Sequence, residues 1–289
     1  TVIITFISMK FEQIMPSATT MADATLPTVA MDTEAGTQYN VLHGYTSELD
    51  STLFYGNITP VAKDRKLTVT INTYGEDIEG VAYKIRSLED KSLIENTEVS
   101  DYDNAGSSIN VTFNIKNLLD TGKEYALEVV LKTKKHETVY YYTRIVYGVD
   151  YDLQKKLDFV MDFNACTFDD SRLKDIAGYL ETSSSGDNTN YGKVNINCSL
   201  SQVGWGDLDP YVESDIMPEV ISVDDDVAIL RLSYRVGAAN DYSSSDTYTV
   251  SEYYRIRQTN SGFYLLNFER EMNQVFDARN DLTSTAKIN

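Results

Sequence analysis

The sequence predicts a mainly β protein, in which an antiparallel sandwich is followed by an α+β domain whose helices lead into a curved antiparallel sheet. Three observations support this prediction. Short segments between residues 28 and 149 alternate apolar and polar residues with a period of two. A glycine-containing turn precedes a long strand near residue 125. A helical stripe of apolar residues begins after Asp150.

The first half of the chain predicts strands joined by short turns. The hairpin turn Lys134–Glu137 separates the last two of them. We expect Val29–Met31 and Leu42–Tyr45 to be edge strands that lead into the sandwich. The other predicted strands are Leu67–Ile71, Val81–Ile85, Ile109–Phe113, Tyr125–Leu131 and Val139–Tyr147.

The segment from Leu118 to Val129 is typical of a β-sandwich corner. Gly122 supplies the turn, and the Tyr125 hydroxyl is expected to bond with the backbone just upstream. Together with the hairpin into Tyr140–Tyr142, these residues resemble the fibronectin type III and immunoglobulin-like superfamily, although the cysteine pair and core tryptophan of antibody domains are absent here. The resemblance implies adhesion, spacing or presentation rather than catalysis.

The second half predicts helices first and strands afterwards. Asp150 or Asp152 is placed to cap a helix, and a second short helix is expected from Ser171 to Leu180. The turn Thr259–Gly262 closes a hairpin. The helical stripe is Leu153, Leu157, Val160, Met161 and Phe163, and the predicted strands are Val194–Leu200, Val227–Val236, Thr247–Gln258 and Gly262–Phe268.

This order of elements, with the hairpin of Tyr253–Arg257 and Gly262–Leu266, resembles the cystatin and NTF2-like families. The resemblance implies a concave sheet face that holds a small ligand or packs against a neighbour.

Five segments are expected along the chain. Residues 1–15 are expected to be a partial membrane anchor or a signal segment, because they begin with the apolar run Thr1–Met9. The anchor is called partial because this run is far shorter than the ~20 residues that span a bilayer. An amphipathic helix or a buried strand remains an alternative for this run. Residues 16–27 form a linker, 28–149 the sandwich, 150–277 the α+β domain, and 278–289 a tail or the start of a further element.

The net charge of −19 restricts the expected partners. Phosphate backbones and anionic lipid headgroups are repelled by such a surface, so we expect no nucleic acid partner and no membrane contact beyond the N-terminal segment. Low cysteine and lysine counts with 21 tyrosines suit an extracytoplasmic protein. The expected partner is another envelope protein or a cell-wall polymer, and no cofactor is expected.

The sequence offers little support for catalysis or metal binding. The two histidines, His43 and His136, have no nucleophile elbow near them. Asp101–Gly106 resembles half of a calcium loop, but an EF-hand requires an oxygen ligand where Ala105 stands. Asp224–Asp226 is expected to be a solvated turn. Paired carboxylates for glycoside hydrolysis remain open, because no pair stands out among many acids.

The two cysteines, Cys166 and Cys198, both lie in the second half of the chain. An extracytoplasmic setting permits a disulfide between them. Two buried thiols that act as small hydrophobic groups are an equally good interpretation.

The loop around Trp205 is the candidate binding site of the sequence. The lone indole is flanked by glycines and followed by Asp207, Asp209 and Tyr211, which together offer a flat apolar face with polar neighbours. The alternative, which we favour, is that Trp205 fills the end of its own domain core, because a large aromatic side chain gains from burial.

The predicted function is that of a membrane-anchored, non-enzymatic binding or scaffold protein of the cell envelope. Two alternatives remain open. The chain is an accessory region of a polysaccharide-processing envelope enzyme whose catalytic domain is absent here, or it is an extracytoplasmic sensor or regulator of a membrane kinase.

Overall fold

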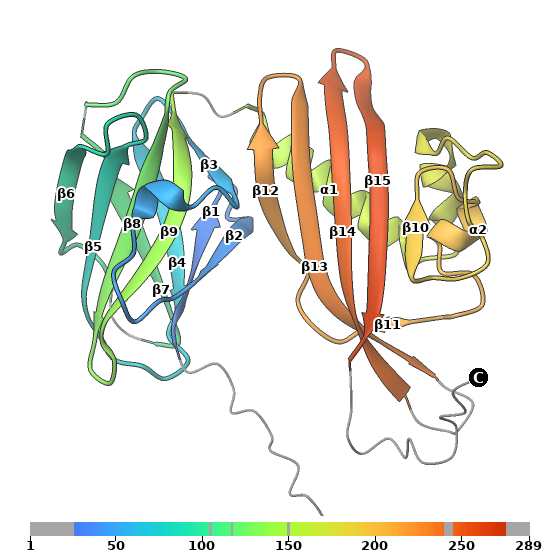
Figure 1. Ribbon diagram of the computed structural model, residues 1–289, viewed down its shortest axis with the longest axis horizontal. Helices are drawn as coiled ribbons and strands as arrows, with labels where there is room; N and C mark the ends of the chain where they lie inside the picture. The colour runs from blue at the N-terminus through green and yellow to red at the C-terminus, as the bar shows by residue number, and fades with distance from the viewer. Residues whose placement is uncertain (1–25, 104–105, 117, 149–150, 240–244, 276–289) are drawn as a thin grey trace, which may run out of the picture. The chain divides into compact units, whose positions relative to one another are not determined.

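The computed structural model describes residues 26–103, 106–116, 118–148, 151–239 and 245–275. The predicted anchor, most of the predicted linker, and the C-terminal tail therefore lie outside the described residues. The described chain from Leu26 to Val275 groups into one compact unit by its contacts, and the predicted division into two domains stays a prediction. Strands dominate, and they form three sheets (Figure 1). The mainly β prediction is thereby confirmed.

Residues 28–147 form a pair of sheets, called here the N-terminal sheet pair. The smaller sheet has the strand order β2-β1-β4-β7, and the larger has the order β3-β9-β8-β5-β6. All neighbours are antiparallel except β3 and β9, which are parallel. The bounds are β1 Thr28–Asp32, β2 Gln38–His43, β3 Ile58–Val61, β4 Lys66–Asn72, β5 Ile78–Ser87, β6 Leu93–Val99, β7 Ser108–Asn114, β8 Glu124–Thr133 and β9 Glu137–Tyr147.

The two sheets bury their facing side chains against each other. Val81, Tyr83 and Ile85 on β5 alternate with more exposed residues, as expected where a strand has one buried face. The ring of Tyr83 stacks on Phe113 of β7, at 4.8 Å between centroids. The opposite, outward face of β5 carries Lys84 and Arg86, which belong to the cleft region described below.

The predicted tyrosine interaction is confirmed. The Tyr125 hydroxyl accepts a hydrogen bond of 2.8 Å from the backbone N–H of Asp120, and Tyr125 is buried. Gly122 has φ +76°, a left-handed conformation that glycine adopts without strain, and its N–H bonds to the carbonyl of Tyr147. This corner is thus fixed by local sequence.

Some strand predictions need correction. Val29–Met31 was expected at an edge, but β1 lies between β2 and β4. Strands β3 and β6 were not predicted, because β3 contains Pro60 and β6 is a polar edge strand with only Glu95 buried. Their places in the sheet depend on pairing with distant strands.

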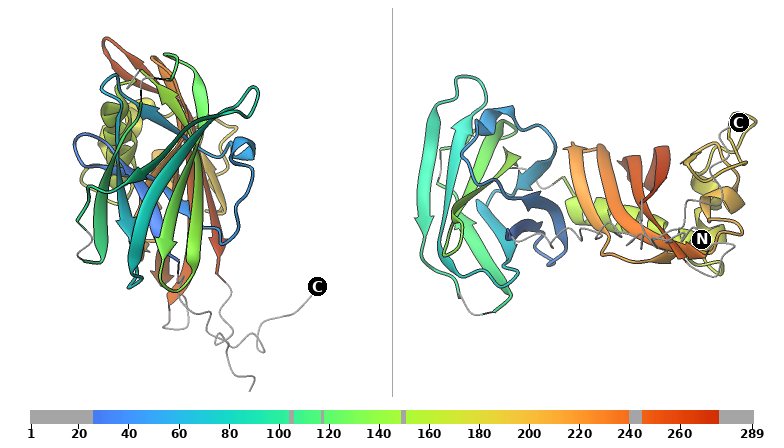
Figure 2. Two further views of the ribbon diagram at one scale, coloured as in Figure 1. Left: turned by 90° about the vertical axis from the view of Figure 1, so that its left-hand side faces the viewer. Right: turned by 60° about the horizontal axis from the view of Figure 1, so that its bottom comes forward.

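Residues 153–274 form a helix–sheet region. Helix α1 (Leu153–Thr167) precedes a six-stranded sheet in which β10-β15-β14-β13-β11 are in order and β12 pairs with β13. Figures 1 and 2 show α1 along one face of this curved sheet. The other bounds are η2 Leu173–Tyr179, β10 Lys193–Asn195, α2 Leu200–Val203, β11 Tyr211–Val212, β12 Met217–Val223, β13 Val227–Ala239, β14 Ser245–Thr259 and β15 Gly262–Gln274.

The predicted helical stripe is confirmed, since Leu153, Leu157, Val160 and Phe163 are buried. The capping prediction is only partly right. Asp152 occupies the N-cap position, but its side chain makes no capping hydrogen bond and instead bonds with Lys155 at 2.9 Å.

Further segments of this region differ from the sequence predictions, and the strands β11 and β12 were not predicted. The expected strand Val194–Leu200 is shorter, because β10 ends at Asn195 and Leu200 begins α2. The expected second helix is the 3₁₀ helix η2.

The Asp224–Asp226 turn has a structural partner that the sequence did not indicate. The ammonium of the buried Lys156 donates to the carbonyls of Asp224 at 2.9 Å and Asp225 at 3.0 Å, and also to Tyr151. Burial lowers the pKa of Lys156, although the nearby aspartates oppose that shift. The turn therefore holds α1 against the β12–β13 hairpin.

Candidate binding cleft

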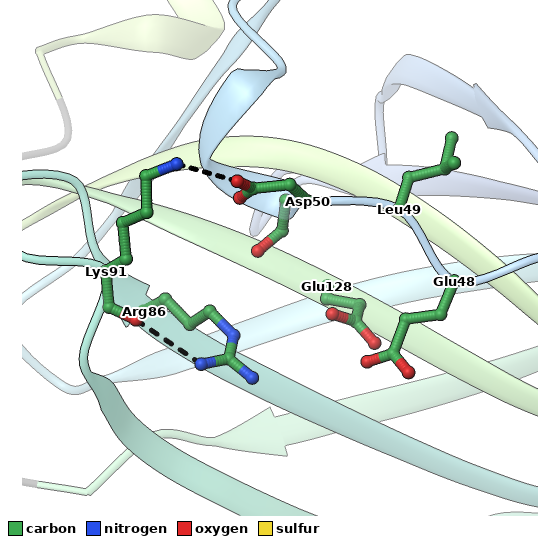
Figure 3. A pocket seen from close by; sticks show the side chains of 7 residues that line it. Glu48, Leu49, Asp50, Arg86, Lys91 and Glu128 are labelled. Carbon is green, nitrogen blue, oxygen red and sulfur yellow. Dashed lines mark hydrogen bonds and ion pairs between the residues drawn. The ribbon is translucent and has the colours of Figure 1, made fainter.

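A polar cleft opens on the outward face of the larger sheet of the N-terminal sheet pair. Its volume is about 410 Å³, within the ~300–1,000 Å³ usual for small-ligand sites. Figure 3 shows its seven lining residues and labels all of them except Ser51. The lining residues are Glu48, Leu49, Asp50, Ser51, Arg86, Lys91 and Glu128.

Strand register explains why these side chains meet. Lys84 of β5 lies opposite Glu128 of β8, and Glu128 lies opposite Tyr142 of β9. All three therefore project from the same outward face. The connection between β2 and β3, with its 3₁₀ helix η1 (Ser51–Leu53), contacts β5 and β8. Glu128 is consequently buried although it points away from the core between the sheets.

The wall formed by η1 is held by a local cap. The Asp50 carboxylate accepts from the Thr52 N–H at 3.1 Å and from the Thr52 hydroxyl at 2.6 Å. It also pairs with Lys91 at 2.7 Å. These bonds, the one from Lys91 first, lower the pKa of Asp50 to about 2, so the carboxylate stays ionised at any ordinary pH.

Charges in the cleft are balanced. Lys84 bridges Glu48 at 2.7 Å and Glu128 at 2.8 Å. Burial disfavours the charged form of Lys84, but the bonds to Glu128 and Glu48 outweigh it and raise its pKa. Arg86 and Lys91 line the cleft together with the three carboxylates of Glu48, Asp50 and Glu128, and Lys84, which is not a lining residue, supplies the third cation.

Several polar groups in the cleft have no partner among the described residues. Arg86 donates only through Nη1, to the carbonyl of Lys91 at 3.3 Å, which leaves Nε and Nη2 unbonded. Glu128 accepts only at Oε1. The Ser51 hydroxyl is buried and unbonded. Figure 3 shows the Arg86 guanidinium pointing across the cleft toward the carboxylates of Glu128 and Glu48, and no ion pair joins them.

Exposed apolar side chains lie along the β2–β3 connection, part of which lines the cleft, and they are called here the rim. They are Tyr45, Leu49, Leu53 and Tyr55, which are 43%, 41%, 65% and 59% exposed. Of these four, Leu49 lines the cleft itself. Buried contacts fix the segment that carries them. The ring of Phe54 stacks on Tyr142 at 4.4 Å between centroids. The Tyr142 hydroxyl accepts from the backbone N–H of Leu49 at 2.7 Å.

The residues predicted around Trp205 have a different arrangement from the one expected of a binding platform. Trp205 is 1% exposed, and the Arg270 guanidinium lies 3.6 Å from its ring centroid. Its indole N–H donates to the Thr167 hydroxyl at 3.3 Å. Trp205 therefore fills the core, as the favoured alternative held, and the exposed indole platform is wrong.

Its predicted neighbours are dispersed. Asp207, Asp209 and Tyr211 are exposed. Only Asp209 shares a surface hollow with Trp205, and Asp207 and Tyr211 do not line it. The binding role of these three side chains stays a prediction.

Arg270 belongs to a polar network beneath α1 that is closed around the Glu252 carboxylate, while the buried Nη2 of Arg270 has no hydrogen-bond partner among the described residues. Its Nε donates to Glu252 Oε1 at 2.7 Å, and both residues are fully buried. Tyr234 donates to Oε1 at 3.0 Å. Asn164 and Tyr254 donate to Oε2 at 2.8 and 2.6 Å. Burial, followed by the Glu252 charge, raises the pKa of both tyrosines well above the ordinary value.

The other sequence candidates offer no assembled site. Cys166 and Cys198 are both buried free thiols, so the disulfide is absent. Burial raises the pKa of Cys166. His136 lies 3.6 Å from the buried Glu76 carboxylate. Within the described ranges, no group of three or more side chains could hold a metal ion. The calcium-like segment is only partly described, because residues 104–105 fall outside them.

The cleft residues escaped sequence analysis because Ser51, Arg86 and Glu128 belong to no motif. The only signal was that Lys84 and Glu128 occupy outward positions of predicted strands. Nothing in the sequence indicated that a distant segment covers them.

Comparisons with known proteins add little. No family model matches the chain, and no curated protein matches it. Among solved structures, the chain is similar to Spo0M, a sporulation control protein from Bacillus subtilis, with 8% identity and a TM-score of 0.22. The match covers 75% of this chain and 86% of that chain. Likeness at this TM-score supports no statement about fold or function.

Proposed function

We propose that this chain is a non-enzymatic binding or scaffold protein of the cell envelope, and that its contact surface is the cleft with its apolar rim. The observation that carries the proposal is that the β2–β3 connection both lines the cleft and exposes large apolar side chains. Four large apolar side chains are exposed along the connection that also lines the cleft, and in the cleft the Arg86 guanidinium keeps donors without a protein partner. Exposed apolar groups beside convergent polar groups are typical of binding surfaces.

The same proposal assigns finer folds to the two regions. The strand orders of the N-terminal sheet pair, its parallel β3–β9 pairing and its tyrosine corner support an immunoglobulin-like sandwich. Helix α1 followed by a curved antiparallel sheet supports an NTF2-like or cystatin-like domain. Such sandwiches present loops for contact, which agrees with a role for the β2–β3 connection.

The envelope setting rests on the sequence. The apolar run at Thr1–Met9, the polar linker and the acidic composition support an extracytoplasmic position with an N-terminal attachment. No helix among the described residues is long and apolar enough to cross a membrane. Protease accessibility of the chain in intact cells tests this setting, and protection from an external protease would overturn it.

The binding role is tested by retention of envelope components on the immobilised full chain. The test variant is Leu53→Ser with Tyr55→Ser, which removes the rim's most exposed groups. The matched control is Leu118→Ser with Tyr264→Ser, whose side chains are 56% and 49% exposed elsewhere. We expect a component retained by wild type and control to be lost with the rim variant. Equal retention by all three proteins, or none by wild type, would contradict the proposal.

A further inference from the structure

We propose that the cleft binds one neutral sugar unit of a polysaccharide, with the Arg86 guanidinium on one side of the sugar and the Glu128 and Glu48 carboxylates on the other. This inference rests on the proposed binding function and names its ligand class. It is argued from the unbonded groups of the cleft and from its charge balance.

A ligand group that bridges Arg86 and the two glutamates must both accept and donate hydrogen bonds. Nε and Nη2 of Arg86 are donors only, and a carboxylate oxygen is an acceptor only. No ion pair joins Arg86 to Glu128 or Glu48, although Figure 3 shows them facing each other. A hydroxyl accepts from a guanidinium and donates to a carboxylate at once, so adjacent hydroxyls of a sugar ring can bridge the two sides.

Glu128 keeps bonding capacity that a ligand in the cleft can use. It is 1% exposed and accepts a hydrogen bond only at Oε1, from Lys84. Its Oε2 is not among the sealed atoms without a partner, so it is reachable from the cleft that Glu128 lines. A bound hydroxyl can donate to it. The Ser51 hydroxyl also lacks a partner among the described residues, but it is sealed from solvent and lies out of reach of a ligand.

The mixed charges of the cleft favour a neutral ligand. An anionic group entering the cleft meets Glu48, Asp50 and Glu128, while a cationic group meets Arg86 and Lys91. The carboxylates of Glu48 and Glu128 are already paired with Lys84, which does not line the cleft. The chain's net charge of −19 adds repulsion against anionic polymers. A neutral polyol bonds with groups of both signs and carries no charge to be repelled.

The test is calorimetric titration of the full chain with neutral oligosaccharides built from glucose, mannose, galactose or N-acetylglucosamine. We expect at least one of them to bind. Because the ligand is uncharged, its affinity should be nearly independent of salt concentration. Arg86→Lys keeps the charge but loses the fork, and Glu128→Gln loses the acceptor charge. Each is expected to weaken binding by about tenfold or more.

The urea resistance of the free protein separates a binding role from a structural one. Arg86→Lys should leave it nearly unchanged, because Arg86 makes a single hydrogen bond of 3.3 Å to the Lys91 carbonyl, while binding weakens. A side chain that served only the fold would lose stability without losing binding. Arg255→Lys, at an exposed position on β14, is the matched control and should bind as wild type.

The outcomes distinguish this inference from the function it rests on. If rim-dependent retention of an envelope component is observed but no neutral oligosaccharide binds, the sugar inference is overturned and the binding function stands. Binding of an acidic oligosaccharide, a basic peptide or a free amino acid in place of neutral sugars also overturns it. If neither retention nor sugar binding occurs, both proposals fail.

Discussion

Glu128 and Glu252 are both buried glutamates paired with a cation, and their surroundings differ. Glu252 in the helix–sheet region accepts from Arg270, Tyr234, Asn164 and Tyr254, so each carboxylate oxygen has two donors. Glu128 in the N-terminal sheet pair has one donor, Lys84, and faces a cleft. The comparison teaches that burial of charge does not mark a site by itself. A carboxylate whose bonds are complete serves the fold, whereas one with free bonding capacity can serve a ligand.

The largest expected effect is at the closed network. Arg270→Met leaves the Glu252 charge buried without its cation, and loss of one partner of a buried pair costs about 3–5 kcal/mol. Urea denaturation measures the loss. The exposed Arg255→Met is the control and should change the unfolding free energy by less than about 0.5 kcal/mol. A small effect of Arg270→Met would show that the network is not closed as described.

The second-largest expected effect is a loss of stability when Trp205, which packs on Arg270, is truncated. Trp205→Ala removes a 1% exposed indole that packs on Arg270, and truncation of a buried tryptophan costs about 3 kcal/mol or more. Thermal unfolding followed by circular dichroism measures it. Retention of envelope components by the folded variant should equal that of wild type. Loss of retention without loss of stability would return Trp205 to the contact surface.

The third effect is a pH dependence near the cleft. Burial above all, with the charges of Glu128 and Glu48, raises the pKa of Tyr142 to about 12, against about 10 in an unfolded chain. The raised pKa contributes stability that is fully present below pH 10 and is lost as the pH rises toward 12.

Tyr142→Phe should therefore make the unfolding free energy fall less steeply between pH 10 and 12 than in wild type. Near neutral pH the variant should cost about 1 kcal/mol, because the Leu49 N–H loses its acceptor. Denaturant titrations at stepped pH compare the two proteins. Identical slopes would mean that the Tyr142 hydroxyl is as solvated in the folded chain as in the unfolded one.

The smallest expected effect is the stability loss in Glu128→Gln, which is compared directly with that in Glu252→Gln. Glu128→Gln keeps the shape of the side chain, and Lys84 keeps its 2.7 Å pair with Glu48. We expect a loss of about 1 kcal/mol or less, while Glu252→Gln should cost clearly more, because it disturbs four bonds. Parallel urea denaturation of the two variants measures both losses of unfolding free energy. Equal losses would remove the distinction between the complete and the incomplete carboxylate.

The sequence predicted the parts of the molecule that local rules control. The alternation of Val81–Ile85 and Ile109–Phe113, the helical stripe from Leu153 and the bond from Asp120 to Tyr125 depend on residues close in the chain. It failed at β3 and β6, where proline and polar residues hide strands that form through distant pairing. It named the Trp205 loop as the candidate binding site while favouring burial of the indole, and the structure bears out the burial.

The sequence by itself determined that this chain is mainly β, strongly acidic, and built from a run of strands followed by a helix and further strands. These properties follow from composition and from periodicity, which act over a few residues. The tertiary structure alone decided which charges are satisfied. Lys84 and Glu128 lie 44 residues apart, and the segment that covers them comes from before both. Only the fold brings Ser51, Arg86 and Glu128 around one cleft, because hydrogen-bond completeness depends on contacts that sequence separation does not encode.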